Sequence, residues 1–353
     1  DQQEKIEKVQ SEGGPVEIEM DDQGGAEISF DPNAATPEGG EEHFSNLAEF
    51  LDDGILSELA QNLSDKYTEY KESRSDWEQS YREGLDLLGF KYQRRTQPFR
   101  GASSVTHPVL AEAVAQFQAT AYKELLPSDG PVRTQILGDV TAPKQDQANR
   151  VKDFMNYQLM DQMKEYEPEF DQMLFYLPLS GSTFKKVYYD DLLGRAVSKF
   201  VHSDDLVVPY SATSLEDAEA IVHVIKISEN ELRKQQVSGF YKDVELGEPP
   251  VIENQITQKE QELEGVTQNG NEDQFTLLEF HMDLDLEGYE DLGEDGEPTG
   301  IKIPYIVTLD TANTQILSIR RNYEAEDKLK KKVNYFVQFK FLPGTGFYGF
   351  GLI

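Results

Sequence analysis

The sequence contains no cysteine among its 353 residues. Disulfide bonds, zinc–thiolate sites and a thiol nucleophile are therefore excluded together. The sequence also lacks a continuous apolar run of about 18 residues, the length that a membrane-spanning helix needs. It begins Asp1-Gln2-Gln3-Glu4, without the basic and then apolar pattern of a secretion signal. We therefore expect a soluble protein that is synthesised in a cytoplasm and does not enter a membrane.

Positive charge is scarce as well. The chain has 66 acidic against 33 basic residues and a formal net charge of -33. A surface this negative repels nucleic acid at long range, which argues against a protein that reads DNA or RNA sequence. It is compatible with a protein that encloses DNA without gripping it, because a like-charged wall prevents sticking. It is equally compatible with acidity that only keeps the chain soluble.

The usual motifs of catalysis and metal binding are missing. The histidines stand singly, at His43, His107, His202, His223 and His281. No His-Glu-x-x-His, Gly-x-Ser-x-Gly or phosphate-binding Gly-x-x-x-x-Gly-Lys-Ser motif occurs. Strand alternation would place His281, Asp283 and Asp285 on one face as metal ligands, but an exposed strand face gives the same alternation without a metal. We predict no enzyme activity, no metal and no cofactor.

Two regions have few apolar residues. Residues 1–54 are rich in Asp, Glu, Gly and Pro, so they cannot offset the entropy of ordering, and we predict a disordered acidic tail. Within it, the alternation in residues 16–20 would allow a strand to add to a partner. Residues 245–274 are also polar and contain Pro249-Pro250. We predict that they form an exposed insertion.

Between these regions, apolar residues recur with a helical period. The predicted helices cover residues 56–88, 109–126 and 144–166, with a short strand at 132–137. Gly89 ends the first helix and Pro108 opens the second, as is usual for these residues. The single tryptophan, Trp77, lies at helical spacing, and we interpret it as a packing anchor. A shorter and more apolar helix is predicted at 167–181.

The period changes to that of β-strands after residue 182. The predicted strands cover residues 184–189, 195–201, 206–208, 221–227, 275–286, 301–309, 315–320 and 333–341. The first two form a hairpin. Ser228 is predicted to cap a short helix at 229–236, with Glu231 at the capping-box position. The sequence therefore predicts an α+β fold in which helices precede a mostly antiparallel β block.

Three segments carry distinctive motifs. The first is Phe99–Val114, which includes Gly101, Ser103, Ser104, His107 and Pro108. The second runs from Phe170 through Gly181 and continues into Ser203–Tyr210 and Ile227–Lys234. The third is Phe341–Leu352, which includes Pro343, Gly344, Tyr348 and Gly349. In their order and spacing these segments resemble portal proteins, the head-to-tail connectors of tailed double-stranded-DNA bacteriophages, and specifically the long portals of short-tailed phages.

The resemblance implies a role in the virion. Residues 55–166 would correspond to the wing of a portal, 167–181 to its stem helix, 182–342 to its clip and 343–353 to the start of the returning stem. The chain would then be one subunit of a homo-oligomeric, dodecameric ring at the portal vertex of the capsid. Its expected partners are terminase, tail adaptor proteins, the capsid protein and double-stranded DNA, which passes through without sequence recognition.

The chain differs from portals in one respect, because in portals the third segment leads into further stem, wing and crown regions that are absent after Ile353. We therefore expect the chain to be truncated. Ring closure needs heterologous contacts, and we predict the apolar residues Phe170, Leu174 and Phe175 as the oligomer interface. Two alternatives stay open: another virion or scaffolding component with an acidic docking tail, or a metal-dependent hydrolase that uses His281, Asp283 and Asp285.

Overall fold

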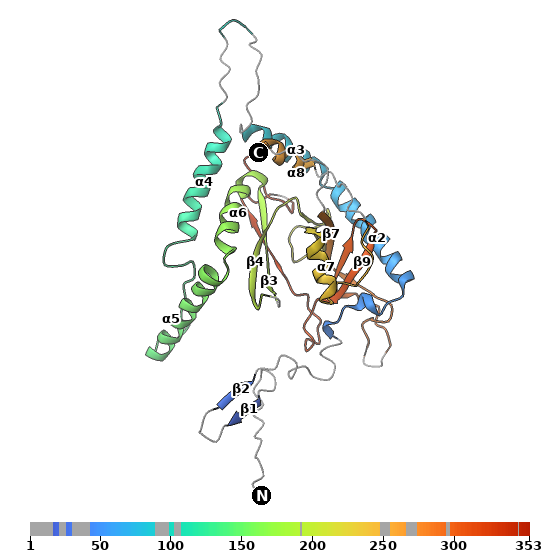
Figure 1. Ribbon diagram of the computed structural model, residues 1–353. Coiled ribbons are helices and arrows are strands. Elements are labelled where there is room, and N and C mark those ends of the chain that lie inside the picture. Colours follow the sequence, from blue (N-terminus) through green and yellow to red (C-terminus); the bar gives the residue numbers. More distant parts are fainter. Residues whose placement is uncertain are drawn as a thin grey trace.

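The chain folds into antiparallel sheets flanked by helices, as the predicted α+β class requires (Figure 1). The computed structural model describes residues 17–20, 26–29, 43–88, 99–101, 107–190, 193–247, 255–265, 274–293, 297–344 and 346–353. Among these residues, no helix has the length and apolar character needed to cross a bilayer.

Most of the predicted acidic tail, residues 1–54, lies outside the described residues. Its described part includes two short strands, β1 (Glu17–Met20) and β2 (Ala26–Ser29), which pair antiparallel. Residues 43–54 are folded, which moves the start of the folded chain ahead of the predicted boundary. Here the short helix η1 (Leu47–Glu49) buries Leu47 and Ala48 in the main core.

The larger sheet has five strands in the order β5-β6-β7-β8-β9, and all neighbours are antiparallel. The strands are β5 (Leu206–Val207), β6 (Ala220–Ser228), β7 (Gln274–Leu284), β8 (Ile303–Asp310) and β9 (Gln315–Arg321). Each overlaps a predicted strand, because β-branched and aromatic residues dominate these stretches. Their buried side chains, among them Phe280, Tyr305 and Val307, form the centre of the main core.

The smaller sheet has three strands in the order β10-β3-β4. They are β3 (Ser182–Asp190), β4 (Arg195–Val201) and β10 (Phe336–Lys340). β3 and β4 form the predicted hairpin, and β10 pairs antiparallel with the other side of β3. Phe184 of β3 packs with Leu206 and Ile221 of the larger sheet, so an apolar cluster joins the two sheets.

The predicted helix over residues 56–88 is broken into α2 (Asp53–Glu72), α3 (Ser75–Leu85) and the single turn η2 (Asp86–Leu88). The break falls at Arg74, whose side chain is buried. Leu56, Ala60 and Leu63 of α2 are buried against the larger sheet. Helix α2, the first part of the predicted helical region 55–166, therefore shares one hydrophobic core with the larger sheet of the predicted strand region 182–342.

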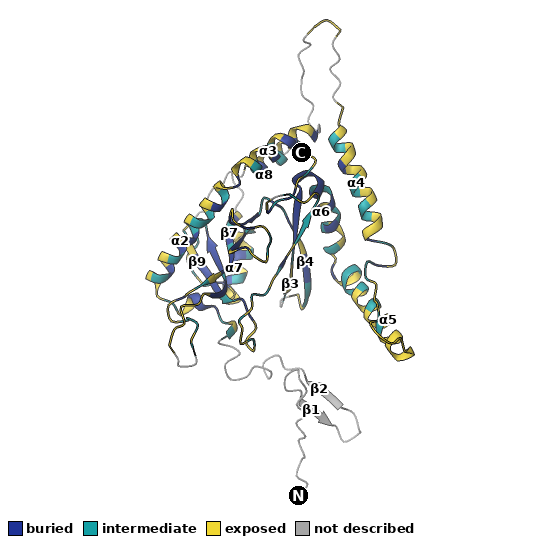
Figure 2. Cartoon of the chain, turned by 180° about the vertical axis from the view of Figure 1, so that it is seen from behind, coloured by how far each residue is buried: buried dark blue, intermediate teal, exposed yellow. Residues whose placement is uncertain are grey.

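The other long helices lie along the smaller sheet, on the side away from α2 (Figure 1). They are α4 (Val109–Leu125), α5 (Ala142–Tyr157), the short π-helix η3 (Gln158–Gln162) and α6 (Tyr166–Ser180). α6 packs between α4 and the sheet, since Phe170 and Leu174 contact the Phe117 side of α4 and Phe200 of β4. α5 projects from the body with its residues exposed or half-buried (Figure 2).

Two local predictions are wrong. Residues 132–137 form no strand, because the Val132 backbone N–H donates to the Asn156 side chain at 2.9 Å instead of to a strand partner. Residues 245–274 are not wholly an exposed insertion, because they include α8 (Gln255–Glu264), whose Ile256 is buried with Tyr81 of α3. The rest of that insertion lies mainly outside the described residues.

The helix after β6, α7 (Glu229–Val237), begins as predicted. The Ser228 hydroxyl accepts a hydrogen bond from the Glu231 backbone N–H at 3.3 Å. This side-chain acceptor satisfies one of the otherwise unpaired amides of the first turn. Leu232 then packs the helix onto the larger sheet through Phe275 and Leu277.

Candidate functional site

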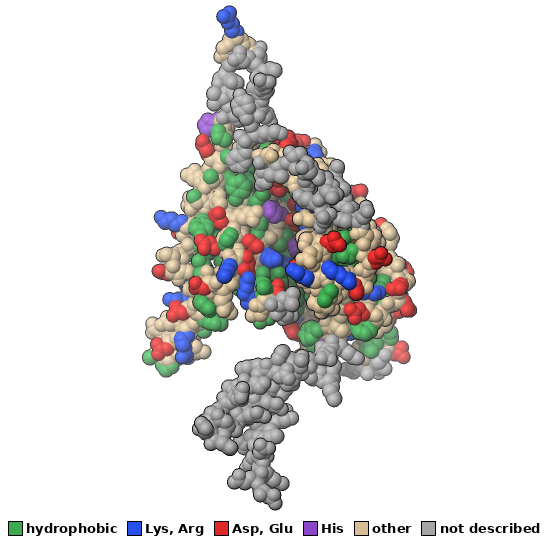
Figure 3. Space-filling model, viewed as in Figure 1, with side chains coloured by type: hydrophobic (Ala, Val, Ile, Leu, Met, Phe, Trp, Pro, Cys, Tyr) green, Lys and Arg blue, Asp and Glu red, His purple; other side chains and the backbone are tan. Residues whose placement is uncertain are grey.

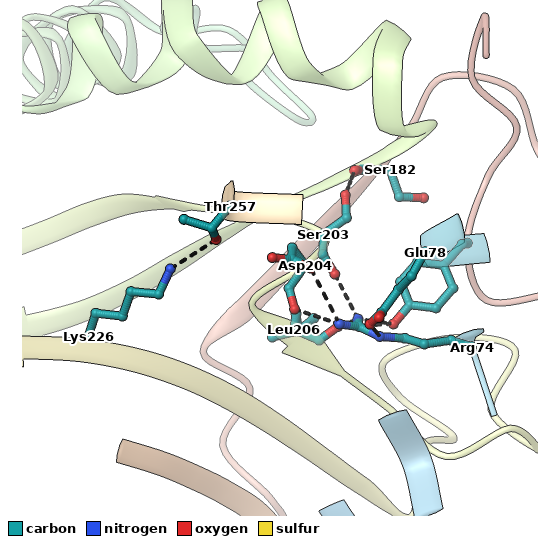
Figure 4. Close-up of polar contacts among 9 residues, drawn as sticks. Arg74, Glu78, Ser182, Ser203, Asp204, Leu206, Lys226 and Thr257 are labelled. Carbon is teal, nitrogen blue, oxygen red and sulfur yellow. Dashed lines mark hydrogen bonds and ion pairs between the residues drawn. The ribbon is translucent and has the colours of Figure 1, made fainter. Parts of the chain in front are cut away.

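A buried arginine joins segments that are far apart in the sequence. Arg74, at the break between α2 and α3, is 6% exposed. Its Nη1 donates to the carbonyl oxygens of Ser203 and Leu206, both at 2.9 Å, and its Nη2 to that of Asp204 at 2.6 Å (Figure 4). Its Nε donates to Glu78 at 2.8 Å. One guanidinium therefore ties the helix pair to the loop that precedes β5.

The same guanidinium reaches the third motif segment. Arg74 Nη1 donates to the hydroxyl oxygen of Tyr348 at 2.9 Å, and that hydroxyl donates to the Leu206 carbonyl at 3.0 Å. Trp77 stacks on the Tyr348 ring with a centroid distance of 4.8 Å. The prediction that Trp77 is a packing anchor is confirmed. We call Arg74, Trp77, Glu78 and Tyr348, with the carbonyls of 203–206, the Arg74 junction.

The charges of the Arg74 junction are fixed near neutral pH. Burial alone would lower the pKa of Arg74, but Tyr348, Glu78 and Asp204 hold that pKa above its ordinary value. Burial raises the pKa of the Tyr348 hydroxyl, so this group stays neutral. All three guanidinium nitrogens donate to acceptors of the chain itself. Arg74 is thus committed to joining segments rather than to binding a ligand.

Next to this junction, the third segment packs backbone to backbone on the end of α6. Gly181 ends α6 with a φ of 77°, and a Cβ atom there would clash with the Gly349 carbonyl. The Gly349 N–H donates to Ser182 Oγ at 2.7 Å, and the Leu352 N–H donates to the Pro178 carbonyl at 2.7 Å. Such a close approach requires glycine, because any side chain would occupy the space of the facing backbone.

The three motif segments meet at this end of α6. The second supplies Gly181 and the carbonyls of 203–206, and the third supplies Tyr348 and Gly349. The first reaches it through α4, because Val114 packs in the same cluster as Leu179 of α6. Of the motif residues outside the contact, Gly101, His107 and Pro108 are exposed, Pro343 and Gly344 lie in the turn after β10, and Ser103 and Ser104 lie outside the described residues.

The predicted oligomer interface needs correction. Phe170 is 8% and Leu174 1% exposed, and both pack inside the chain against α4 and the smaller sheet. Phe175 is half-buried beside Val114. Side chains covered by their own chain cannot at the same time contact a second subunit. An apolar helix in a sequence indicates burial but does not say whether the covering surface belongs to the same chain.

A second group of buried charges lies between the two sheets. Lys186 Nζ of β3 donates to both carboxylate oxygens of Glu279 of β7, at 2.6 and 2.8 Å, and the same carboxylate lies 2.6 Å from His281 Nε2. His223 Nδ1 of β6 is 3.9 Å from Glu279, too far for a hydrogen bond. The rings of both histidines contact Phe336 of β10. We call these four charged or titratable residues the inter-sheet cluster.

The titration of the inter-sheet cluster is shifted by its burial. Burial lowers the pKa values of His223 and His281, so both are neutral near pH 7. Burial would raise the pKa of Glu279, but Lys186 and the two histidines hold it well below its ordinary value. The cluster is then an ion pair of Lys186 and Glu279 with neutral histidines beside it. Glu279 and Lys186 were not predicted, because acids are abundant in this chain; their position within otherwise apolar strands is the signal that marks them.

The candidate metal ligands of the sequence are not assembled into a site. His281 is 3% exposed and faces Glu279, whereas Asp283 and Asp285 are exposed. The part of the chain that the structure describes contains no group of three or more His, Cys, Asp or Glu side chains that could hold a metal ion. His281 lies in the covered part of β7, whereas Asp283 lies near its exposed end and Asp285 follows the strand.

Comparison with known proteins identifies no relative: no protein-family model and no curated protein matches the chain. The site is therefore defined by the arrangement of its residues. The Arg74 junction and the glycine contacts beside it form a rigid joint between the end of α6, the loop before β5 and the third motif segment. Such a joint fixes the end of α6, from which β3 of the smaller sheet continues, relative to the start of β5 in the larger sheet.

Proposed function

We propose that this chain is a structural subunit of a bacteriophage portal, the ring through which DNA enters and leaves the capsid. The observation that carries the proposal is the meeting of the three portal-like segments at one end of α6. Segments that resemble a family only by chance have no reason to come together in space. The second and third segments form contacts that need their particular residues, and the first packs against them through Val114.

The dependence on particular residues is clearest in the third segment. Gly349 and Gly351 of this segment allow backbone contact with the end of α6 where a Cβ atom would clash. Tyr348 supplies both a hydroxyl for Arg74 and a ring for Trp77. These residues are the ones that make the segment similar to portals. In a ring subunit, the joint that they build would hold the stem-like helix α6 at a fixed angle to the clip-like sheets.

The charge of the chain supports the same function. A net charge of -33 gives a wall that repels the phosphate backbone, so DNA can move past it in both directions without being trapped. In this role the protein performs no catalysis. It resides in the virion, at the portal vertex, after synthesis in the host cytoplasm. Its partners are copies of itself, terminase during packaging, tail adaptor proteins afterwards, and the surrounding capsid protein.

Electron microscopy of the complete gene product tests the proposal. Negatively stained particles are expected to be rings with a central hole and dodecameric symmetry. A different virion or scaffolding component would give particles without a hole. A protein that stays monomeric at high concentration would contradict the proposal.

A further inference from the structure

Helix α5 presents an uncovered apolar stripe. Val151, Phe154 and Met155 lie at the i, i+3, i+4 spacing that places them on one side of the helix. They are 45%, 58% and 42% exposed. All residues of α5 are described, and none is buried. An isolated helix of this length is only marginally stable in water, so a helix with such a stripe is normally covered by another surface.

The body of the chain holds α5 by a different side. Asn156 makes two hydrogen bonds to the backbone of Val132, and the Thr134 hydroxyl donates to the Ala148 carbonyl at 3.2 Å. The segment that precedes α5 therefore lies beside Ala148 and Asn156, and it leaves the three side chains of the apolar stripe 42–58% exposed. Figure 3 shows hydrophobic and charged side chains mixed on this projecting lobe, at the lower left of the view.

The charges of α5 differ from those of the chain as a whole. Lys144, Arg150 and Lys152 outnumber Asp146 and Asp153 within the helix, although the whole chain has twice as many acidic as basic residues. Arg150 and Lys152 directly flank Val151 and so lie on the two borders of the stripe. A partner that fits α5 should therefore have apolar side chains with acidic residues around them.

Three exposed aromatic side chains lie on the other side of the molecule, two of them around Arg320 and the third next to exposed acids. Phe44, Phe50 and Phe240 are 57%, 65% and 44% exposed. Arg320 holds two of them together, because its guanidinium donates to the carbonyls of Phe44 and Phe240 at 2.7 and 2.9 Å. Phe50 lies at the other end of η1 from Phe44, and the exposed acids Glu49 and Asp52 border it. We call Phe44, Phe50 and Phe240, with Arg320 and the acids Glu49 and Asp52, the aromatic patch.

The stripe and the aromatic patch lie on opposite sides of the sheets. Both views of the ribbon place α5 beyond α4 and α6, whereas α2 and β9, next to which η1 packs, lie on the opposite side (Figures 1 and 2). Two different surfaces on opposite sides of one molecule associate head to tail. Repetition of a head-to-tail contact generates a ring when the rotation closes.

We propose that the apolar stripe of α5 docks on the aromatic patch of a second copy of this chain, with Arg150 and Lys152 facing Glu49 and Asp52. The proposal rests on the proposed function, in which copies form a closed ring, and it identifies the surfaces that meet. It replaces Phe170 and Leu174, which are buried within one chain, with residues that are exposed in the single chain. The occupant is a second copy because the basic residues that border the stripe, Arg150 and Lys152, complement Glu49 and Asp52, the exposed acids beside Phe50.

The 353 residues contain no cysteine, so a cross-link between two cysteines introduced here is a direct test once any cysteine elsewhere in the gene product is replaced by serine. A Val151→Cys, Phe240→Cys double variant of the complete gene product is oxidised and separated on a non-reducing gel. We expect a ladder of covalent oligomers, because thiols held side by side have a much higher effective concentration than thiols that meet by diffusion. The yield should exceed that of the control by about tenfold or more. The control pairs Val151→Cys with Leu329→Cys, at a residue that is 73% exposed and outside the aromatic patch.

Charge exchange provides a second measurement. Arg150→Glu should shift the mass distribution from rings toward monomers, and Asp52→Lys in the same chain should restore the rings. If wild-type rings form but neither the ladder nor the charge exchange behaves in this way, the docking proposal is overturned while the portal function stands. If the wild-type protein forms no rings, the portal function is overturned together with the docking proposal.

Discussion

The Arg74 junction and the inter-sheet cluster both bury charge, but they satisfy it in different ways. Arg74 donates mainly to backbone carbonyls, which do not titrate, and its pKa lies above the ordinary range. Glu279 is satisfied by Lys186 and by His281, an imidazole whose pKa is lowered by burial. We therefore expect the stability of the Arg74 junction to be independent of pH near neutrality, and the stability of the inter-sheet cluster to depend on pH.

The largest expected effect is that of removing Arg74. Arg74→Met leaves the carbonyls of Ser203, Asp204 and Leu206 without their donor and Glu78 without its ion pair. Breaking a buried charge network by removing one partner costs about 3–5 kcal/mol of unfolding free energy. Urea denaturation of Arg74→Met and of the wild-type chain measures this loss of unfolding free energy. Arg233→Met is the control, because its ion pair with Asp243 is exposed and such pairs contribute about 0–1 kcal/mol. Equal losses of unfolding free energy in the two variants would show that Arg74 does not hold the Arg74 junction together.

The next effect tests the glycine contact beside the same junction. A Cβ atom at Gly349 would lie 2.5 Å from the Gly181 carbonyl oxygen and 2.7 Å from that of Leu342. Gly349→Ala therefore forces the backbone apart and should reduce stability by about 1–3 kcal/mol. Gly346→Ala is the matched control, because nothing lies within 4 Å of its added Cβ. A Gly349→Ala variant as stable as Gly346→Ala would contradict the close packing of the third segment on α6.

The two joints also differ in how well the sequence predicts them. Alternation and turn residues were sufficient for the hairpin of β3 and β4, and the capping pattern for the start of α7. The helix break at Arg74 has no proline or glycine to mark it, because its cause is the bonding of Arg74 to residues about 130 positions later. Local patterns cannot contain such a contact.

The same limit applies to the residues that were predicted for assembly. The apolar character of Phe170 and Leu174 indicated burial correctly, but the sequence could not say that α4 and the smaller sheet would cover them. Conversely, the stripe on α5 has an ordinary helical pattern, and only the structure shows it to be uncovered. Glu279 was one acid among many until the fold placed it between Lys186 and His281.

The third prediction concerns the pH response of the inter-sheet cluster. Because burial lowers the pKa values of His223 and His281, the unfolded chain binds these protons more readily than the folded one. Their contribution to stability is complete above about pH 6.5, the unfolded value, and is lost as the pH falls toward the folded values. His223→Gln should reduce the acid dependence of unfolding by up to about 1.4 kcal/mol per pH unit below 6.5. His107→Gln, at an exposed position, is the control, and an unchanged slope in His223→Gln would count against the cluster as the responsive joint.

The smallest expected effect is a gain in stability, whereas Arg74→Met and Gly349→Ala reduce it. It concerns Asp205, beside the Arg74 junction. Asp205 follows directly after a carbonyl that Arg74 binds, and burial, with the neighbouring Asp204, raises the pKa of its carboxyl to about 6. The folded chain therefore prefers the protonated acid, so the charged form opposes folding. This cost is complete above about pH 6, shrinks as the pH falls below 6, and is gone only below about 3.8, the ordinary value. Asp205→Asn imitates the protonated form and should raise stability by about 1 kcal/mol at pH 8, after allowance for partial solvent screening. The gain should shrink below pH 6 and vanish near pH 3, where Asp205 is neutral in both the folded and the unfolded chain. Urea titrations at the two pH values measure this difference. A gain in stability that is the same at both pH values would contradict the prediction, because the amide would then act through a new hydrogen bond and not through the loss of a buried charge.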